Sequence, residues 1–551
     1  MKKLKPYIIA LIFCTPTSLW AQQKVIKKNL PQPKLVVGIV VDQMRWDFLY
    51  RYASRYGQGG FKRLLRDGFS CNNTQISYIP TVTAAGHAGI YTGSVPALHG
   101  IAGNDWAELT TAKMQYCTED STVQTVGSTS VAGQMSPRNL WATTITDELK
   151  LATNFKAKTI GVALKDRGAI LPAGHTANAA YWFDDVTGNW ITSTYYMNQL
   201  PAWVNQFNGA KNAEKYIAKE WYPLYNIATY TQSEADSNAH EGLFKGEKLP
   251  VFPHLISKIN KGAGTIRNTP YGNSITFDFA KMAIAQEKMG TSNITDFLAI
   301  SLSSTDYIGH WYGPNSAEIE DTYLRLDNDL SSFLSYLDAQ LGKNNYTVFL
   351  TADHGAAHNP VFLTDHNIPA GLFSGNNVLK DLNAKLKIEF GTDNLVLNLS
   401  NYQVNFNNTT IANAKINIDA LKTYCINYLQ QQNEVAYAID MDKISQASIP
   451  PQLKQKIING YNRQRSGAIQ IILKPGYFQG YGLTGTTHGT WNPYDTHIPL
   501  LFMGWGIKHG ELKRQTTMAD IAPTIAALLH VQEPNANIGE PINEVFTKIT
   551  E

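Results

Sequence analysis

The sequence has few cysteines, little net charge and no long hydrophobic run. Only four of its 551 residues are cysteine, and its formal net charge is +3. A chain so poor in cysteine is not a small disulfide-stabilised domain. A nearly neutral chain offers no basic surface for nucleic acid or an anionic membrane, and no stretch reaches the about 20 apolar residues of a transmembrane helix. With no internal repeat either, the sequence predicts a globular protein with a large core, no nucleic-acid partner and no membrane span.

The first 21 residues have the pattern of a secretory signal peptide. Three lysines stand within the first five positions, an apolar run follows at 7–13, and Ala21 is the expected last residue removed. Cleavage there removes the three lysines and with them the whole formal net charge. We therefore expect an exported protein, periplasmic or secreted, whose mature chain is residues 22–551.

Three cysteines remain in the mature chain: Cys71, Cys117 and Cys425. An exported compartment permits a disulfide. Cys71 and Cys117 lie on either side of residues 78–106, so we expect these two to form one. Cys425 is expected to be a buried thiol.

Hydrophobic runs and amphipathic stretches alternate along the chain. The runs are rich in β-branched residues and predict strands at 34–41, 159–164, 296–302, 346–351 and 498–502. The other stretches predict helices at 45–65, 84–91, 145–151, 274–288, 316–341 and 520–529. This alternation predicts an α/β fold with a mostly parallel central sheet flanked by helices.

Two parts of the chain depart from this alternation. Residues 170–270 are rich in Tyr, Trp, Asn and Gly with weak periodicity, and we interpret them as a surface insertion. Residues 375–475 mix alternating and helical segments, which predicts a second insertion of α+β type over the edge of the sheet. The expected organisation is one catalytic domain, 22–551, with these two insertions.

Polar residues lie at the ends of four of the predicted strands: Asp42, Lys165, Asp306 and Asp353. The working residues of such folds gather beyond the carboxyl ends of the strands. A single polar strand end is more often a solvated residue than a functional one, but four in one sheet favour a site.

The segment YIPTVTAAGHAGIYTGSVPALHGIAGNDW, residues 78–106, places Thr83 at or just before the first turn of a predicted helix. Two explanations of Thr83 remain open from the residues alone. Its hydroxyl can cap the first helical N–H groups. Alternatively, the positive end of the helix dipole can stabilise an alkoxide or a bound phosphate there.

Aspartates and histidines occur together at the strand ends and tight turns. Asp306 and His310 are four residues apart, so on a helix they share a face; the others lie in the turns Asp353-His354-Gly355 and His488-Gly489. Mixed Asp/His ligation suits zinc. Six such ligands suffice for two ions, and a pair about 4 Å apart clamps an in-line phosphoryl displacement.

The order of these motifs resembles the alkaline phosphatase superfamily: Asp42, Pro80-Thr-Val-Thr83, Asp306-x-x-x-His310, Asp353-His354-Gly355 and Thr487-His488-Gly489. The pattern PTVTxxGHxxxxTGxxPxxHGIxxN is similar to the nucleophile region of the nucleotide pyrophosphatase/phosphodiesterase branch. Lys165-x-Arg167 departs from those diesterases. It resembles instead the bacterial phosphate-irrepressible alkaline monoesterases of the PafA type, which use a threonine nucleophile.

This resemblance implies a role for each matching residue. Thr83 would be the nucleophile and an accessory metal contact, while Asn104, Lys165 and Arg167 would bind the phosphoryl oxygens. The implied zinc ligands form two sets, one of Asp306, His310 and His488 and the other of Asp42, Asp353 and His354. The implied function is an exported alkaline phosphatase that hydrolyses small phosphate monoesters through a phosphothreonine at a two-zinc site.

Other functions remain as alternatives. A phosphodiesterase or nucleotide pyrophosphatase on the same scaffold is disfavoured by Lys165 and Arg167, because an esterified oxygen gains little from a paired positive charge. A sulfatase would need a Cys or Ser followed by x-Pro-x-Arg, and a cofactor-independent phosphoglycerate mutase would be cytosolic and use serine. An exported zinc- or phosphate-binding protein without turnover is the alternative of a different class. The sequence does not specify the physiological substrate or the oligomeric state.

Overall fold

The computed structural model describes residues 31–547 except 110, 260–261 and 481. Every element described below belongs to one compact unit, Gln32–Glu551. The expected signal peptide lies outside the described residues. Among the described residues, none of the helices combines the length and the apolar character that a membrane-spanning helix requires.

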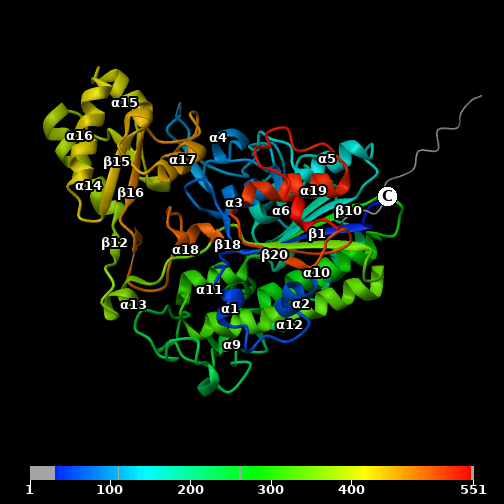
Figure 1. The fold of residues 1–551 in the computed structure, drawn as a ribbon. Helices are drawn as coiled ribbons and strands as arrows, with labels where there is room; N and C mark the ends of the chain where they lie inside the picture. The colour runs from blue at the N-terminus through cyan, green and yellow to red at the C-terminus, as the bar shows by residue number, and fades with distance from the viewer. Residues whose placement is uncertain (1–30, 110, 260–261, 481, 548–551) are drawn as a thin grey trace, which may run out of the picture. The chain divides into compact units, whose positions relative to one another are not determined.

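A ten-stranded sheet forms the centre of the fold (Figure 1). Its five middle strands, β11, β1, β10, β7 and β8, run parallel, whereas β19 and β9 join this block antiparallel on either side. The strands in spatial order are β20 (Gly510–Leu512), β2 (Phe69–Cys71), β19 (Leu500–Gly504), β11 (Tyr346–Thr351), β1 (Leu35–Val41), β10 (Asp296–Leu302), β7 (Thr159–Ala163), β8 (Ala179–Asp184), β9 (Asn189–Ser193) and β6 (Thr125–Val126). The predicted α/β fold with a mostly parallel sheet is confirmed.

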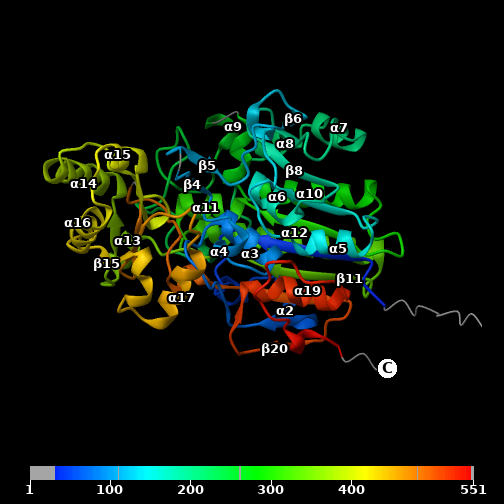
Figure 2. The same cartoon turned by 90° about the horizontal axis from the view of Figure 1, so that it is seen from above.

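Helices cover both faces of this sheet (Figures 1 and 2). One face carries α3 (Thr83–Thr92), α5 (Ile145–Ala152), α6 (Asp166–Ala173) and α19 (Ile521–Leu529). The other carries α2 (Phe61–Asp67), α10 (Tyr271–Gln286), α11 (Ser304–Tyr312) and α12 (Ala317–Leu341). The middle strands β1, β10 and β11 are buried along their whole length, which explains their continuous apolar runs.

Shorter elements connect these layers. The helices are α1 (Phe48–Arg51), α4 (Pro96–His99), α7 (Ala202–Gly209), α8 (Asn212–Ile217), α9 (Ile256–Ile259), α13 (Pro360–Asp365) and α18 (Pro493–Thr496). The strands form small sheets of β4 (Asp105–Ala107) with β5 (Met114–Tyr116), of β12 (Gly371–Phe373) with β17 (Tyr477–Gln479), and of β18 (His497–Ile498), β3 (Thr74–Gln75) and β21 (Thr516–Thr517).

The helix predicted over 45–65 is wrong, because α1 and α2 are separate short helices. The carboxylate of Asp327 lies between them and accepts hydrogen bonds from the N–H groups of Gly57 and Phe61, each at 2.7 Å. A Cβ on Gly60 would lie 2.2 Å from an oxygen of Asp327. A contact with the distant helix α12 thus ends α1 and starts α2.

The predicted surface insertion at 170–270 contains two strands of the central sheet, β8 and β9. Trp182 and Trp190 on these strands are buried. The predicted strand at 498–502 is likewise two strands, β18 and β19, in different sheets. The division of 22–551 into a catalytic domain and insertions otherwise remains a prediction.

Residues 375–473 form a separate α+β layer with its own apolar core. In both views its helices lie together beside the central sheet (Figures 1 and 2). Its sheet has the order β13 (Val396–Asn398), β14 (Gln403–Phe406), β16 (Ile469–Leu473) and β15 (Val435–Asp440), and its helices are α14 (Gly375–Phe390), α15 (Asn408–Asn413), α16 (Ile418–Gln430) and α17 (Pro451–Gly460). We call this segment the insertion.

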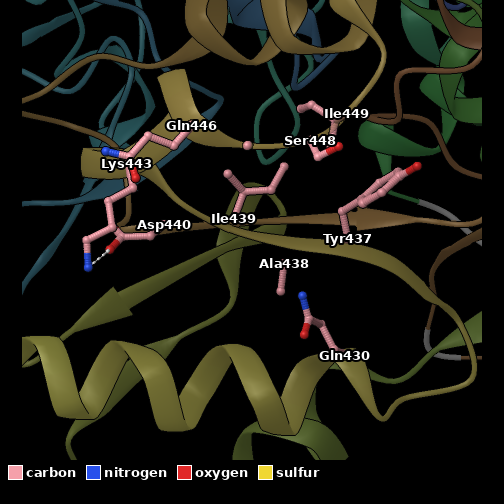
Figure 3. Close-up of a pocket in the computed structure, with 10 residues that line it drawn as sticks. Gln430, Tyr437, Ala438, Ile439, Asp440, Lys443, Gln446, Ser448 and Ile449 are labelled. Atoms are coloured by element: carbon pink, nitrogen blue, oxygen red, sulfur yellow. Dashed lines mark ion pairs between the residues drawn. The ribbon is translucent and has the colours of Figure 1, made fainter.

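The insertion contains a cavity of about 290 Å³ beside β15 (Figure 3). Ile439 lies in its wall, with Lys443 and Asp440, whose charged groups are 3.6 Å apart. A cavity of about 710 Å³ lies near Ile368 and Tyr494. Neither is lined by a residue predicted to bind zinc, so the predicted chemistry belongs elsewhere.

The predicted disulfide between Cys71 and Cys117 is wrong, because both thiols are free and buried. Cys71 belongs to the main core, whereas Cys117 packs in a smaller cluster with Trp106. Burial raises the pKa of Cys71 to about 12. Cys425 is a buried free thiol, as expected.

Candidate active site

The carboxyl ends of four parallel strands bring the predicted residues to one edge of the sheet. The register aligns Val41 of β1 with Leu302 of β10, and the neighbouring residue Val40 with Thr351 of β11. Asp42 follows β1 directly, Asp306 lies in the first turn of α11 after β10, and Asp353 follows β11. All three are buried, as the strand-end pattern predicts.

Thr83 is the first residue of α3 and is buried. Val82 is the N-cap of this helix, and no side chain caps it, so the capping explanation of Thr83 does not hold. The Thr83 Oγ1 atom lies 3.5 Å from Nε2 of His354. The hydroxyl therefore stands at a helix N-terminus and faces a predicted metal ligand.

The small residues after Thr83 permit α3 to pack directly on the loop that follows β11. A Cβ on Gly86 would lie 2.4 Å from the carbonyl oxygen of Asp353. Any larger residue at Gly86 would push the helix away from that loop and change the distance between Thr83 and His354. The Ala84-Ala85-Gly86 run is thus a packing requirement of the site.

Asp306 and His310 share one face of α11, as their spacing predicts. Nε2 of His310 lies 3.1 Å from Oδ1 of Asp306. His488, from the loop before α18, places its Nε2 3.7 Å from the same oxygen. The rings of His488 and His354 stack with centroids 3.5 Å apart.

Each of the three imidazoles is held by the main chain in the same way. Their Nδ1 atoms lie within hydrogen-bond distance of carbonyl oxygens: 2.9 Å for His310 with Thr486, 2.9 Å for His354 with Gly355, and 2.7 Å for His488 with Thr81. A hydrogen bond from Nδ1–H fixes the ring and leaves Nε2 with its lone pair. This is the supporting arrangement that metal-binding histidines have.

Two groups of side chains have ligand atoms close enough to hold a metal ion: Asp306 with His310 and His488, and Asp42 with Asp306 and His354. Within each group the ligand atoms lie within 4.8 Å of one another. Buried oxygens of Asp42 and Asp353 have no hydrogen-bond partner. These donors fit zinc, because nitrogen and carboxylate ligands converge and leave lone pairs directed into the site.

Burial and local charge set the ionisation of these groups. Burial raises the pKa of Asp42 well above its ordinary value. Burial would raise the pKa of Asp306 too, but the charge of His310 and other neighbours hold it well below its usual range. Burial lowers the pKa of His354 and His488. The two imidazoles therefore favour the neutral form, which is the one that binds metals.

Lys165 lies among the carboxylates. Its Nζ is 2.7 Å from Oδ2 of Asp42 and also donates to Asp306. Although burial disfavours a charged amine, Asp306 and Asp42 raise the pKa of Lys165 above its ordinary value. The ammonium therefore stays charged at this position, and its predicted contact with the substrate remains a prediction.

Arg167 and Asn104 are held by neighbouring groups. Nη1 of Arg167 donates to the Tyr116 hydroxyl at 2.9 Å, and that hydroxyl donates to Asp166 at 2.9 Å. Oδ1 of Asn104 accepts from the N–H of Ala84 at 2.9 Å. This bond orients the amide of Asn104 and leaves its NH₂ group as the donor.

Two residues of the site were not predicted. Gln43 donates from Nε2 to Asp306 at 2.6 Å and from its main-chain N–H to Asp353 at 3.1 Å. His87 places Nδ1 3.3 Å from Asp353 and Nε2 2.8 Å from the Ser301 hydroxyl. The position of His87, one turn after Thr83 on the same helix, is the sequence signal that points to it.

Comparison with known proteins agrees with these motifs. The model of the family described as type I phosphodiesterase / nucleotide pyrophosphatase matches residues 36–495. A protein of Myroides odoratus named calcium-transporting ATPase is 56% identical and is covered over 96% of its length by 94% of this chain. Alkaline phosphatase PafA of Elizabethkingia meningoseptica is 53% identical, with 94% of this chain covering 95% of it.

Solved structures support the same relationship. The crystal structure of wild-type alkaline phosphatase PafA is 53% identical to this chain and matches with a TM-score of 0.93, over 94% of this chain and 100% of that one. A murine ectonucleotide pyrophosphatase/phosphodiesterase 5 in complex with AMP, 14% identical with a TM-score of 0.52, shares the fold over 94% of this chain and 100% of its own. The chain therefore belongs to the type I phosphodiesterase / nucleotide pyrophosphatase family and, within it, is a relative of the PafA-type alkaline phosphatases, as its motifs predict.

Proposed function

We propose that this chain is an exported alkaline phosphatase that hydrolyses small phosphate monoesters through a phosphothreonine at a two-zinc site. The observation that carries the proposal is the position of Thr83, at a helix N-terminus and beside two ligand groups that share Asp306. The high identity to PafA over nearly the whole chain supports the monoesterase activity. The first 21 residues support export.

The metal ligands would be the two predicted sets, with His310 and His488 on one side of Asp306 and Asp42, Asp353 and His354 on the other. When bound there, zinc would supply Lewis-acid stabilisation of the oxygens that gain charge during phosphoryl transfer. The chain contributes the fixed directions of the imidazole Nε2 atoms.

Thr83 would attack phosphorus through Oγ1. One bond forms between this oxygen and phosphorus, the bond from phosphorus to the ester oxygen breaks, and the alcohol leaves with a proton. Water then cleaves the phosphothreonine and restores the hydroxyl. The NH₂ group of Asn104 and the first N–H groups of α3 would bind the phosphoryl oxygens.

Lys165 and Arg167 would decide between substrate classes. A monoester carries one more charged oxygen than a diester, and charge-assisted hydrogen bonds to that oxygen favour the monoester. The family description includes phosphodiesterases, so diester hydrolysis is the alternative activity on this scaffold. An exported binding protein without turnover is the alternative of another class.

The test is steady-state kinetics on matched aryl esters, with zinc content measured on the same preparation. Monoester hydrolysis far above diester and sulfate hydrolysis, at about two zincs per chain, supports the proposal. ATP is a further substrate to compare, because one relative is named calcium-transporting ATPase. Faster diester hydrolysis would favour the phosphodiesterase. Phosphate binding without product release would favour the binding protein.

A further inference from the structure

A short hairpin beside the candidate active site carries Asn104 and Tyr116. Its strands β4 and β5 pair antiparallel, with Asp105 opposite Tyr116. Asn104 directly precedes β4, and its carbonyl accepts the N–H of Cys117 at 2.9 Å. Tyr116 also packs against the apolar cluster that contains Ala84 of α3. The hairpin therefore holds Tyr116 close to a predicted substrate contact and to the helix that begins at the proposed nucleophile.

Hydrogen bonds run from Arg167 through Tyr116 to Asp166. Nη1 of Arg167 donates to the Tyr116 hydroxyl, which itself donates to Oδ1 of Asp166, each at 2.9 Å. The other oxygen of Asp166 accepts from the Thr118 hydroxyl at 2.5 Å. Burial raises the pKa of Tyr116 well above its ordinary value, so the hydroxyl keeps the proton that it donates. A neutral hydroxyl thus stands between the guanidinium and the carboxylate.

No direct ion pair balances the charge of Arg167. In the part of the chain that the structure describes, Arg167 forms no ion pair with an aspartate or glutamate. Its Nε is buried and has no hydrogen-bond partner. Lys165 differs, because its Nζ pairs with both Asp42 and Asp306. Of the two predicted cationic contacts to the monoester, Arg167 is the one that keeps an unpaired charge and an unpartnered donor.

A hydroxyl orients a guanidinium without neutralising it. A carboxylate in direct contact would hold Arg167 as firmly, but its negative charge would offset the positive charge that a dianion is to meet. The Tyr116 hydroxyl accepts one N–H and restricts the planar guanidinium, which leaves the other N–H donors for a ligand. Asp166 in turn fixes the direction of the hydroxyl.

We propose that Tyr116 is a positioning residue for substrate selection, which holds Arg167 toward the extra charged oxygen of a phosphate monoester and keeps Asp166 from pairing with it. This role depends on the proposed function, and Tyr116 itself contacts no reacting atom in it. Without the hydroxyl, Arg167 can turn to Asp166. The resulting ion pair would remove the charge that favours a monoester over a diester.

Tyr116→Phe tests this role on the full-length, zinc-loaded protein, because it removes the hydroxyl and keeps the ring. On matched aryl esters, monoester kcat/KM should fall roughly 10–100-fold, the effect of one hydrogen bond to a charged group. Diester kcat/KM should change far less, since a diester lacks the oxygen that Arg167 is positioned to meet. Inhibition by inorganic phosphate should weaken in parallel with the loss on the monoester.

A double-mutant cycle with Arg167→Ala shows whether Tyr116 acts through Arg167. Once Arg167 is alanine, Tyr116→Phe should cause little further loss of monoester kcat/KM. Tyr428→Phe in the insertion is the matched control, because that hydroxyl also donates to a carboxylate, Asp381, at 2.7 Å. The control should change neither rate.

Three results would overturn the role of Tyr116 alone, in a parent protein that hydrolyses monoesters. They are an unchanged monoester rate in Tyr116→Phe, equal losses on both esters, and the same loss with and without Arg167. Equal losses on both esters would mean that Tyr116 supports the fold of the hairpin and not the choice of substrate. A parent protein without monoester turnover would instead overturn the proposed function, and the role of Tyr116 with it.

Discussion

Lys165, at the sheet edge, and Lys422, in the insertion, each lie between two aspartates. Lys165 pairs with Asp42 and Asp306, and all three side chains are at most 4% exposed. Lys422 pairs with Asp440, at 2.9 Å, and with Asp442, whose side chain is 75% exposed. The same residue types thus form a fully buried trio in one region and a partly solvated trio in the other.

The two trios differ in whether a carboxylate oxygen is left without a hydrogen-bond partner. Asp42 keeps an oxygen without a partner, and burying such charges contributes little to stability. Asp440 instead also accepts the N–H of Asp442 at 3.1 Å, which closes the turn after β15. The buried trio lies in the candidate active site, whereas the trio around Lys422 closes a turn of the insertion.

The largest expected effect comes from removing the Thr83 hydroxyl. Thr83→Ala should abolish turnover and leave both zincs bound, because the hydroxyl is the proposed nucleophile and only an accessory metal contact. Acid quenching should trap a phosphorylated peptide in the parent and none in the variant. Thr92→Ala, at the other end of α3, is the control and should retain activity. Parent-like turnover in Thr83→Ala would contradict the assignment.

Zinc removal should affect the candidate active site and leave the insertion folded. A strong chelator is expected to abolish activity, which added zinc restores, because the metals supply most of the charge stabilisation. The insertion has its own apolar core, so its secondary structure should remain. Metal analysis and circular dichroism on the same sample check this. Full activity in metal-free protein would exclude the two-zinc proposal.

A double variant at the sheet edge, Lys165→Ala/Arg167→Ala, should lower monoester kcat/KM by about 10²–10⁴. This follows from about 1.5–3 kcal/mol for each hydrogen bond to a charged group, with some non-additivity. Diester hydrolysis should fall far less. Lys422→Ala is the matched control and should change neither rate. Equal losses on both esters would mean that Lys165 and Arg167 support the site without reading substrate charge.

A smaller effect is expected at Arg465, where the insertion holds the segment that carries Asn104. Nη1 of Arg465 donates to the carbonyls of Gly100 and Asn139, at 2.6 and 2.7 Å. Its guanidinium also lies over the rings of Trp106 and Trp141, at 4.6 and 4.3 Å.

Arg465→Ala should therefore misplace Asn104 and raise KM for the monoester, by about tenfold if one hydrogen bond of roughly 1–1.5 kcal/mol is lost. Arg465→Lys should not restore KM, since lysine cannot make the planar contacts. Inhibition by inorganic phosphate should weaken in parallel. A loss of Tm with KM unchanged would show that Arg465 stabilises the fold without positioning Asn104.

The smallest effect concerns the solvated trio. Asp442→Asn should lower the free energy of unfolding by about 0–1 kcal/mol, the range of exposed ion pairs, because the Asp442 side chain is 75% exposed. A hydrogen bond from Lys422 lowers the pKa of Asp442 in the folded protein. The pair therefore stabilises above the ordinary carboxyl pKa, and its contribution is lost as pH falls through the lowered one. Urea unfolding should show the parent and variant converging below about pH 4. A difference that persists there would have another origin.

Much of the site follows from the sequence because strand ends and helical spacing are local properties. The runs that end at Asp42 and Leu302 are buried strands, and the four-residue spacing of Asp306 and His310 places them on one helix face. His488 stands out by its glycine-flanked turn, but its grouping with Asp306 and His310 required the family resemblance, since no local pattern gives its neighbours.

What the sequence did not predict depends on distant contacts. The break between α1 and α2 is set by Asp327, far along the chain. Gln43 takes its role from a left-handed turn, with φ of 65°, that follows β1. The free thiols of Cys71 and Cys117 lie in separate apolar clusters. The disulfide was predicted from the exported compartment and from the order of the two cysteines along the chain, and neither tells how far apart they lie in the fold.

The two strands that bound the insertion bear on how this chain can change over evolution. β12 and β17 pair with each other, with Gly371 opposite Tyr477, so the chain leaves and re-enters at neighbouring points. A gene can therefore gain, lose or exchange the insertion without changing the strand order of the central sheet. Because Arg465 of the insertion contacts the segment that carries Asn104, exchanging the insertion would also exchange those contacts, although the insertion contributes none of the proposed reacting groups.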